Sequence, residues 1–337
     1  MTATTASRRA SRTVIWFILL FVLIIVLASI VPWSLFLNLV SRLNLFATVF
    51  LGIFIEALPY LLFGTLISGL VEVFLDRELM ARFISKRPVP AAITGALMGL
   101  VFPVCECGVI PLTRRLFHKG LPLPAGIAFL LAAPVFNPIV IFSTSAAFGW
   151  GPMLMWRVGL SLFIAIVVGL VFAVEQDPSN VLRPMLMSVH DHEHTHNETL
   201  SFGDKLQQAL LICADEFFEM GRYLIIGAML AAGLQTFIPQ TSLLAIGSGQ
   251  ILSVLVMIAL AVILSICSTV DAFVALSFVG TFSFGSILSF LVFGPMVDIK
   301  STLMYLQVFH RKPVAYLILI PFLMSLLAGI AFNYFAP

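Results

Sequence analysis

Charged residues are scarce in this sequence: Asp, Glu, Lys and Arg make up 10% of its 337 residues, whereas 61% are hydrophobic. A soluble globular domain is about one quarter charged and roughly half apolar, so this composition argues against one. Apolar stretches long enough to cross a lipid bilayer recur along the chain. We therefore predict an all-α polytopic membrane protein with about 7–9 transmembrane helices.

Further absences narrow the function. The 18 Lys and Arg residues form no basic stripe, so nucleic acid is not expected as a partner. Four cysteines in a chain of this length do not form a disulfide framework. The sequence has no G-x-x-x-x-G-K-[ST] phosphate-binding loop, so transport would use a gradient or another subunit. We expect no cofactor, and an auxiliary subunit or a homo-oligomer remains open.

The apolar stretches and polar gaps divide the chain into five parts. We expect a cytoplasmic tail at 1–13, an extra helix at 14–37, a first half at 41–174, a His-containing polar loop at 175–204 and a second half at 205–337. The basic tail precedes an apolar run that is too long for a cleaved signal peptide. This pattern predicts an inner (cytoplasmic) membrane protein with its N-terminus in the cytoplasm.

The two halves match each other in sequence. FIEALPYLLFG (54–64) aligns with FFEMGRYLIIG (217–227) and pairs Glu56 with Glu219, an offset of 219 − 56 = 163. Cys105 then pairs with Cys267 at an offset of 162, and Asn137 with Asp298 at 161. Matching blocks in the same order indicate an internal duplication.

The orientation of the halves depends on residues 91–119. If 91–104 and 106–119 form a re-entrant hairpin, each half has three full spans and the second half is inverted. The basic residues Arg114, Arg115 and Lys119 at the end of the hairpin then lie in the cytoplasm, as the positive-inside rule prefers. In the rival topology 91–112 is a full span, and the acidic loop 175–204 mildly favours it. We prefer the inverted arrangement.

The stretch FPVCECGVIP (102–111) places Glu106 between Cys105 and Cys107 in an apolar region. Residues two apart in a regular helix point to different sides, but Pro103 and Gly108 predict a break in the helix here. In extended backbone the two thiols face the same way. A charged residue at the bilayer centre costs about 2.5–3.5 kcal/mol on insertion scales, so a glutamate there indicates a function. Broken helices at this depth are typical of transport sites.

The second half offers Cys267 at the matching place and Asp271 four residues later. If both breaks meet, three thiols and two carboxylates converge, a ligand set that selects thiophilic species. Asn137 and Asp298 each follow a proline within an apolar span and could bind substrate, although a plain kink explains these prolines almost as well.

Two further groups could contribute. Glu56 and Glu219 are candidates for proton coupling, although Arg222 three residues after Glu219 could form a structural ion pair with it. The loop tract VHDHEHTH (189–196) could capture metal weakly through four alternating histidines, which are His190, His192, His194 and His196.

The chain resembles the predicted-permease family that includes YraQ-like proteins and ArsP-type organoarsenical efflux permeases. The resemblance rests on PVCECGVIPLTRRLFHKGLPL (103–123), AFLLAAPVFNPIV (128–140) and the weaker CSTVDAFVALSF (267–278). It implies a multi-pass inner-membrane permease in which cysteines, here Cys105, Cys107 and Cys267, bind a thiophilic substrate.

The function expected from these observations is efflux of a thiophilic metal ion or trivalent organometalloid, by a transporter and not an enzyme. Two alternatives remain open. One is a membrane thiol-disulfide oxidoreductase, and the other is an importer of a small sulfur compound. The duplication favours transport, because inverted repeats provide alternating access.

Overall fold

The computed structural model describes residues 33–75, 85, 87–175, 180–183, 202–237 and 249–335. The N-terminal tail, most of the predicted helix at 14–37 and the histidine tract lie outside the described residues. The predicted metal capture by His190, His192, His194 and His196 is therefore not tested.

The described residues are almost entirely helical, which confirms the predicted all-α class. The helices are α2 (Trp33–Phe74), α4 (Pro88–Val101), α5 (Glu106–His118), α6 (Leu123–Ala132), α7 (Pro138–Phe148), α8 (Pro152–Phe172), α9 (Phe202–Phe237), α11 (Leu252–Leu264), α12 (Asp271–Leu276), α13 (Phe284–Met296), α14 (Ile299–Val308) and α15 (Arg311–Phe335). In the part of the chain that the structure describes, five helical segments are long and apolar enough to cross a membrane: Leu37–Phe74, Pro152–Phe172, Phe202–Phe237, Phe284–Val308 and Arg311–Phe335.

The chain divides into two compact units, Met1–Thr48 and Val49–Pro337. The described part of the first unit is the beginning of α2, which continues as helix through residues 38–43. From the sequence, the extra helix was expected to end at residue 37 and the first half to begin at residue 41. The other described helices belong to the second unit, which holds the hydrophobic core.

The second unit repeats one order of helices twice. Among the described helices, a long helix is followed by four short ones and then by another long helix, so α2 to α8 correspond to α9 to α15. Short helices α6 and α7 begin at residues 123 and 138, and their counterparts α13 and α14 begin at 284 and 299, an offset of 161 in both cases. The structural elements therefore follow the offset found between the two halves of the sequence.

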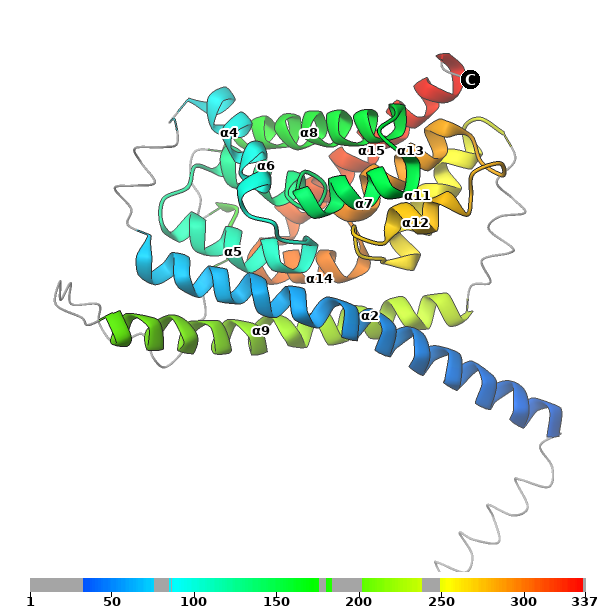
Figure 1. Cartoon of the computed structure of the whole chain (residues 1–337), viewed down its shortest axis with the longest axis horizontal. Coiled ribbons are helices and arrows are strands. Elements are labelled where there is room, and N and C mark those ends of the chain that lie inside the picture. Colours follow the sequence, from blue (N-terminus) through cyan, green and yellow to red (C-terminus); the bar gives the residue numbers. More distant parts are fainter. Residues whose placement is uncertain are drawn as a thin grey trace, which may run out of the picture. The chain divides into compact units, whose positions relative to one another are not determined.

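The two equivalent long helices run in opposite directions. Gly69 of α2 packs against Ala209 of α9, Thr65 hydrogen-bonds Cys213 at 3.5 Å, and Ile53 clusters with residues 228 and 231. Residues near the end of α2 thus contact residues near the start of α9, and earlier residues of α2 contact later residues of α9. In Figure 1 this part of α2 and α9 lie side by side, with opposite colour progressions.

Helices α4 and α5 form a hairpin beside α6. Gly95 and Gly99 of α4 pack against Ala125 and Ala133, so α4 runs parallel to α6. In contrast, α5 runs antiparallel to it, because Phe117 near the end of α5 packs against the start of α6 at Gly126. The chain therefore returns to the level at which it entered, as expected for a re-entrant hairpin.

Contacts at the ends of the helices define two faces of the second unit. Face A is where α5 ends and α15 begins, and the rings of Phe117 and Phe309 meet there with centroids 6.2 Å apart. The segment 180–183 joins this face through a hydrogen bond of 2.8 Å from Arg183 N to Val308 O. Face B is where α8 begins and α15 ends, with the rings of Trp156 and Phe332 4.7 Å apart.

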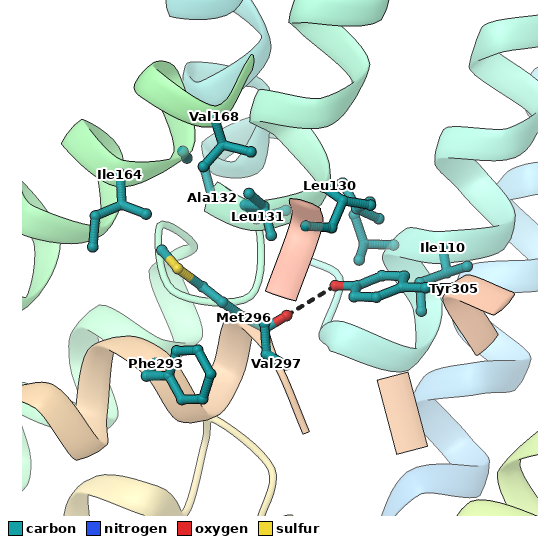
Figure 2. Close-up of a cluster of buried hydrophobic side chains, with 14 of the residues drawn as sticks. Ile110, Leu130, Leu131, Ala132, Ile164, Val168, Phe293, Met296, Val297 and Tyr305 are labelled. Atoms are coloured by element: carbon teal, nitrogen blue, oxygen red, sulfur yellow. Dashed lines mark hydrogen bonds between the residues drawn. The ribbon is translucent and has the colours of Figure 1, made fainter. Parts of the chain in front are cut away.

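Both halves contribute to one hydrophobic core. Figure 2 shows Ile110 of α5, Leu130 of α6 and Ile164 of α8 with residues of α13 and α14. Within this cluster the Tyr305 hydroxyl donates to the Met296 carbonyl at 3.0 Å. That carbonyl belongs to the last residue of α13, where α13 gives way to α14. Tyr305 therefore satisfies a polar group that the end of a helix leaves without an intrahelical partner.

Candidate functional site

The first helix break lies between α4 and α5. Residues 102–105 are not helical, and Cys105 is the N-cap residue of α5 with extended backbone (φ −83°, ψ −179°). Glu106 and Cys107 are the first two residues of α5. Only Cys105 is therefore in the extended conformation that the sequence pattern predicted for the whole trio.

The second break lies between α11 and α12. Ser265 closes α11 in the left-handed region (φ 46°, ψ 43°), which is uncommon for a residue other than glycine. Its hydroxyl accepts a hydrogen bond of 3.4 Å from the backbone N–H of Ile299, at the start of α14. The break in α11 is thereby connected to the junction of α13 and α14.

The two breaks bring Cys105, Glu106 and Cys267 together, and we refer to these three residues as the sulfur centre. Their ligand atoms all lie within 4.8 Å of one another, and the residues are only 4%, 2% and 3% exposed. The Cys267 thiol donates to Glu106 Oε2 at 3.9 Å, and the Ser268 hydroxyl donates to the same oxygen at 3.5 Å. Two thiols and one carboxylate in this arrangement could ligate a soft metal ion.

The other two cysteines lie outside the sulfur centre. Cys107 is buried in the first turn of α5, two residues after Cys105, and its side chain interacts with that of Cys105, but it is not among the three ligand atoms that lie within 4.8 Å of one another. Cys213 is buried on α9 and hydrogen-bonds with Thr65 of α2. Cys213 therefore has a packing role, and it provides a control cysteine for experiments on the sulfur centre.

A buried lysine faces the sulfur centre from α14. Lys300 Nζ lies 3.8 Å from Glu106 Oε1 and 3.4 Å from Asp298 Oδ2. Asp298 is the N-cap residue of α14: its Oδ1 accepts from the Ser301 N–H at 2.6 Å in a complete capping box. The predicted substrate ligand Asp298 is thus a cap and an ion-pair partner, adjacent to the sulfur centre through Lys300.

Asn137 is the counterpart of Asp298 and caps α7 in the same way. Its Oδ1 accepts from the Val140 N–H at 3.0 Å, and its Nδ2 donates to the Val104 carbonyl at 3.5 Å. Asn137 therefore connects the start of α7 to the backbone just before Cys105. The Asn137 side chain thereby stabilises the helix break before α5, and its amide group is not part of the sulfur centre.

Asp271 is engaged in a separate ion pair. Arg157 Nη2 lies 2.6 Å from Asp271 Oδ2, and Arg157 Nη1 donates to the Thr144 hydroxyl at 2.8 Å. Arg157 is completely buried, and its partners come from α7 and α12. Asp271 is therefore paired with an arginine of the first half and is not one of the three converging ligand residues, although it interacts electrostatically with Glu106.

The two glutamates predicted to carry protons have different surroundings. Glu219 pairs with Arg114 at 3.1 Å and accepts a hydrogen bond of 2.7 Å from Gln307, so its partner here is not the Arg222 expected from spacing. Glu56 is half-buried on α2, and its Oε1 is buried without a hydrogen-bond partner among the described residues. It interacts electrostatically with Lys300, which places Glu56 near the sulfur centre.

Neighbouring ion pairs connect the halves toward face A. Arg115 lies 3.4 Å from Glu216 of α9 and 3.8 Å from Glu72 of α2. Lys119 lies 3.4 Å from the same Glu72. Together with the Arg114–Glu219 pair, these contacts attach the basic end of α5 to both long helices.

Sequence reasoning missed Lys300 and Arg157. Each is a lone cation in an otherwise apolar stretch, and such a residue is costly in a membrane unless it is paired. That cost could have indicated that each cation has a buried partner. The identity of the partner could not be predicted, because it depends on which helices meet.

Comparisons with known proteins agree with this architecture. The family model described as "Predicted permease" (ArsP_1) matches residues 42–334. The chain is 46% identical over 273 residues to UPF0718 protein YcgR of Bacillus subtilis, covering 80% of this chain and 91% of the relative. It is 38% identical over 271 residues to a Streptococcus mutans protein, covering 78% and 87% of the two chains. No solved structure matches.

Proposed function

The chain belongs to the ArsP_1 family of predicted permeases, and from that premise we propose that it exports a thiophilic species through the sulfur centre. The species would be a soft metal ion or a trivalent organometalloid. Cys105, Glu106 and Cys267 would bind it, with Cys107 next to them. The observation that carries this proposal is the convergence of two thiols and a carboxylate within 4.8 Å at two helix breaks.

The arrangement of the halves supports transport over a fixed catalytic role. Equivalent helices α2 and α9 run in opposite directions, which favours an inverted repeat. In such a repeat the substrate site lies where the halves meet, and rocking of one half against the other opens it to either side. The sulfur centre has this location, because Cys105 and Cys267 occupy matching positions.

The distribution of positive charge suggests an orientation. Arg114, Arg115 and Lys119 lie toward face A, where Arg311 and Lys312 begin α15. The positive-inside rule then places face A in the cytoplasm. Together with the basic N-terminal tail, this supports an inner-membrane protein with a cytoplasmic N-terminus.

A second subunit is part of this proposal. The Streptococcus mutans relative carries a name that describes a subunit of a two-component membrane permease complex. A corresponding partner would act with this chain. Copurification of a tagged chain from its native host tests this, with a second membrane protein in constant ratio as the expected result.

The proposed function is tested by resistance and accumulation assays in a strain that lacks its own exporters. Wild type is expected to protect against zinc, copper or methylated arsenite and to lower cellular accumulation of the same species. Cys105→Ser and Cys267→Ser should lose this protection, whereas Cys213→Ser should retain it because Cys213 lies outside the centre. Equal protection by all variants would remove the thiols from the mechanism.

The same strains distinguish the two alternatives. Increased accumulation of a sulfur compound with wild type, lost in Cys105→Ser, would indicate import. A disulfide between Cys105 and Cys267 that forms and disappears during turnover would indicate a thiol-disulfide oxidoreductase. Either outcome would replace the efflux proposal.

A further inference from the structure

Lys300 is held between carboxylates from the two halves. Its side chain is 3% exposed, with Nζ 3.4 Å from Asp298 on its own segment and 3.8 Å from Glu106 on α5. Its Cα and stem lie against α9 at Gly227, where an added Cβ would be 2.9 Å from Lys300 Cα. The stem is thus fixed by packing, and the ammonium group alone reaches the sulfur centre.

The ion pair between Lys300 and Glu106 is loose. Glu106 Oε1 and Asp298 Oδ2 are buried and form no hydrogen bond with any other described residue. By contrast, Arg157 and Asp271 are 2.6 Å apart with hydrogen-bond geometry. A buried carboxylate oxygen that is neutralised at 3.8 Å without a hydrogen bond is available to a stronger partner.

We propose that Lys300 is a tethered counter-cation. Its ammonium group neutralises Glu106 when no substrate is bound, and a cationic substrate displaces it from Glu106. The inference rests on the proposed function and narrows its substrate class to a soft metal cation. Lys300 is a positioning and specificity residue in this scheme. It remains protonated throughout and stays paired with Asp298 when the substrate occupies Glu106.

The charges near the sulfur centre support a cation as substrate. Glu106 and Asp298 are buried, Glu56 is half-buried nearby, and Lys300 is the cation that faces them from α14. Three carboxyl groups thus lie near one described ammonium group, so the site has more potential negative charges than positive ones. The ligand set of two thiols and one oxygen also suits a soft cation, since cationic metals accept mixed sulfur and oxygen ligands.

Competition within the site has a consequence for release. When the substrate leaves, the ammonium returns to Glu106, so the empty site is not left with an unpaired buried carboxylate. Lys300 thereby weakens substrate binding and favours dissociation. A permease needs this property, because a site that binds too tightly does not release its substrate.

The test compares Lys300→Met, Lys300→Arg and the control Lys312→Met with wild type, each as the purified full chain. Equilibrium binding is measured for two probes: Cd²⁺, which is cationic, and phenylarsine oxide, which is neutral and thiol-reactive. Transport of Cd²⁺ is measured in proteoliposomes. Lys312 is an exposed lysine at the start of α15, outside the sulfur centre.

We expect Lys300→Met to bind Cd²⁺ about tenfold or more tightly and to transport it more slowly, with no change for phenylarsine oxide. Lys300→Arg should behave nearly like wild type, and Lys312→Met should be identical to it. If Lys300→Met does not accumulate, Lys300→Met/Asp298→Asn removes one charge of each sign and is used in its place. Unchanged or weaker Cd²⁺ binding, or equal changes for both probes, would overturn the inference.

The two proposals fail in different ways. If wild type bound neither probe more tightly than Cys105→Ser does, the proposed function itself would be contradicted. Cys105-dependent binding of phenylarsine oxide but not of Cd²⁺ would leave a thiophile permease and reject the tethered cation.

Discussion

The two helix breaks at the centre of this protein occupy matching positions and differ in chemistry. Glu106 of the first break corresponds to Ser268 of the second at an offset of 162. In the structure Ser268 donates a hydrogen bond to Glu106 at 3.5 Å, so the two equivalent positions face each other. A symmetric pair would have placed two glutamates there, and like charges at this distance repel.

The same asymmetry extends to the short helices beyond the breaks. Lys300 of α14 corresponds to Ile139 of α7, and Asp271 of α12 corresponds to Val109 of α5, at offsets of 161 and 162. The placement of the helices therefore repeats between the halves. Single substitutions in one half or the other account for the charges, and three experiments test how far this division holds.

The largest effect is expected from breaking the buried pair of Arg157 and Asp271. Arg157→Leu should destabilise the protein by about 3–5 kcal/mol, because it leaves the Asp271 carboxylate buried and uncompensated. Thermal unfolding in detergent measures the loss. Glu106→Gln should cost much less, because Glu106 Oε1 already lacks a hydrogen-bond partner among the described residues, yet it should abolish Cd²⁺ binding.

The double variant Arg157→Leu/Asp271→Leu is the control for that comparison. It removes both charges and should recover most of the lost stability, since isosteric apolar pairs replace buried ion pairs with little penalty. A double variant as unstable as Arg157→Leu would show that the charge of Asp271 is not the cause.

A smaller effect is expected from matched glycines on the two long helices. Gly64 of α2 packs against the backbone of Gly108 on α5, whereas its counterpart Gly227 packs against Lys300 on α14. Gly64→Ala should cost about 1–3 kcal/mol, because a backbone must move to accept the methyl group. It should also weaken Cd²⁺ binding, because α5 carries Glu106.

Gly227→Ala should cost less stability, since part of its contact is the Lys300 side chain. Gly221 has open space around it and serves as the control. Gly221→Ala should be neutral or stabilise the helix by up to about 1 kcal/mol. Equal destabilisation by all three alanines would contradict the role of close helix approach, because only Gly64 and Gly227 have a neighbour near the added methyl group.

The smallest effect is expected from the two N-caps. Asn137→Ala should cost about 1 kcal/mol, the usual value of a lost cap. Asp298→Ala should cost more, because it removes a complete capping box and also the nearest partner of Lys300. Chemical unfolding in detergent measures both. Identical losses would mean that the ion pair with Lys300 contributes nothing to stability.

Local patterns in the sequence predicted much of the fold. Apolar length predicted the long helices, and the similar offsets between matching blocks, from 163 to 161 residues, predicted the repeated order of the helices. Pro103 and Gly108 correctly indicated a break near Cys105, although α5 already begins at Glu106. The matching positions of Cys105 and Cys267 predicted that they would meet if the breaks did, and in the structure they lie within 4.8 Å of each other.

The partners of the buried charges could not be predicted in this way. Spacing suggested Arg222 for Glu219, but the partner is Arg114, 105 residues away. Asp271 was expected among the thiols and instead pairs with Arg157, 114 residues away. Each pair joins helices from different halves, and no local pattern specifies which of their faces meet.

The sequence by itself determined that this is a helical membrane protein with two matching halves and a thiol at each break, because hydrophobic length, helix-breaking residues and repeated motifs are local properties. Only the tertiary structure decided which carboxylate joins the thiols and which cation opposes it. The physical reason is that a buried charge must be neutralised by a group within a few ångströms, and that neighbour is determined by helix packing across the chain.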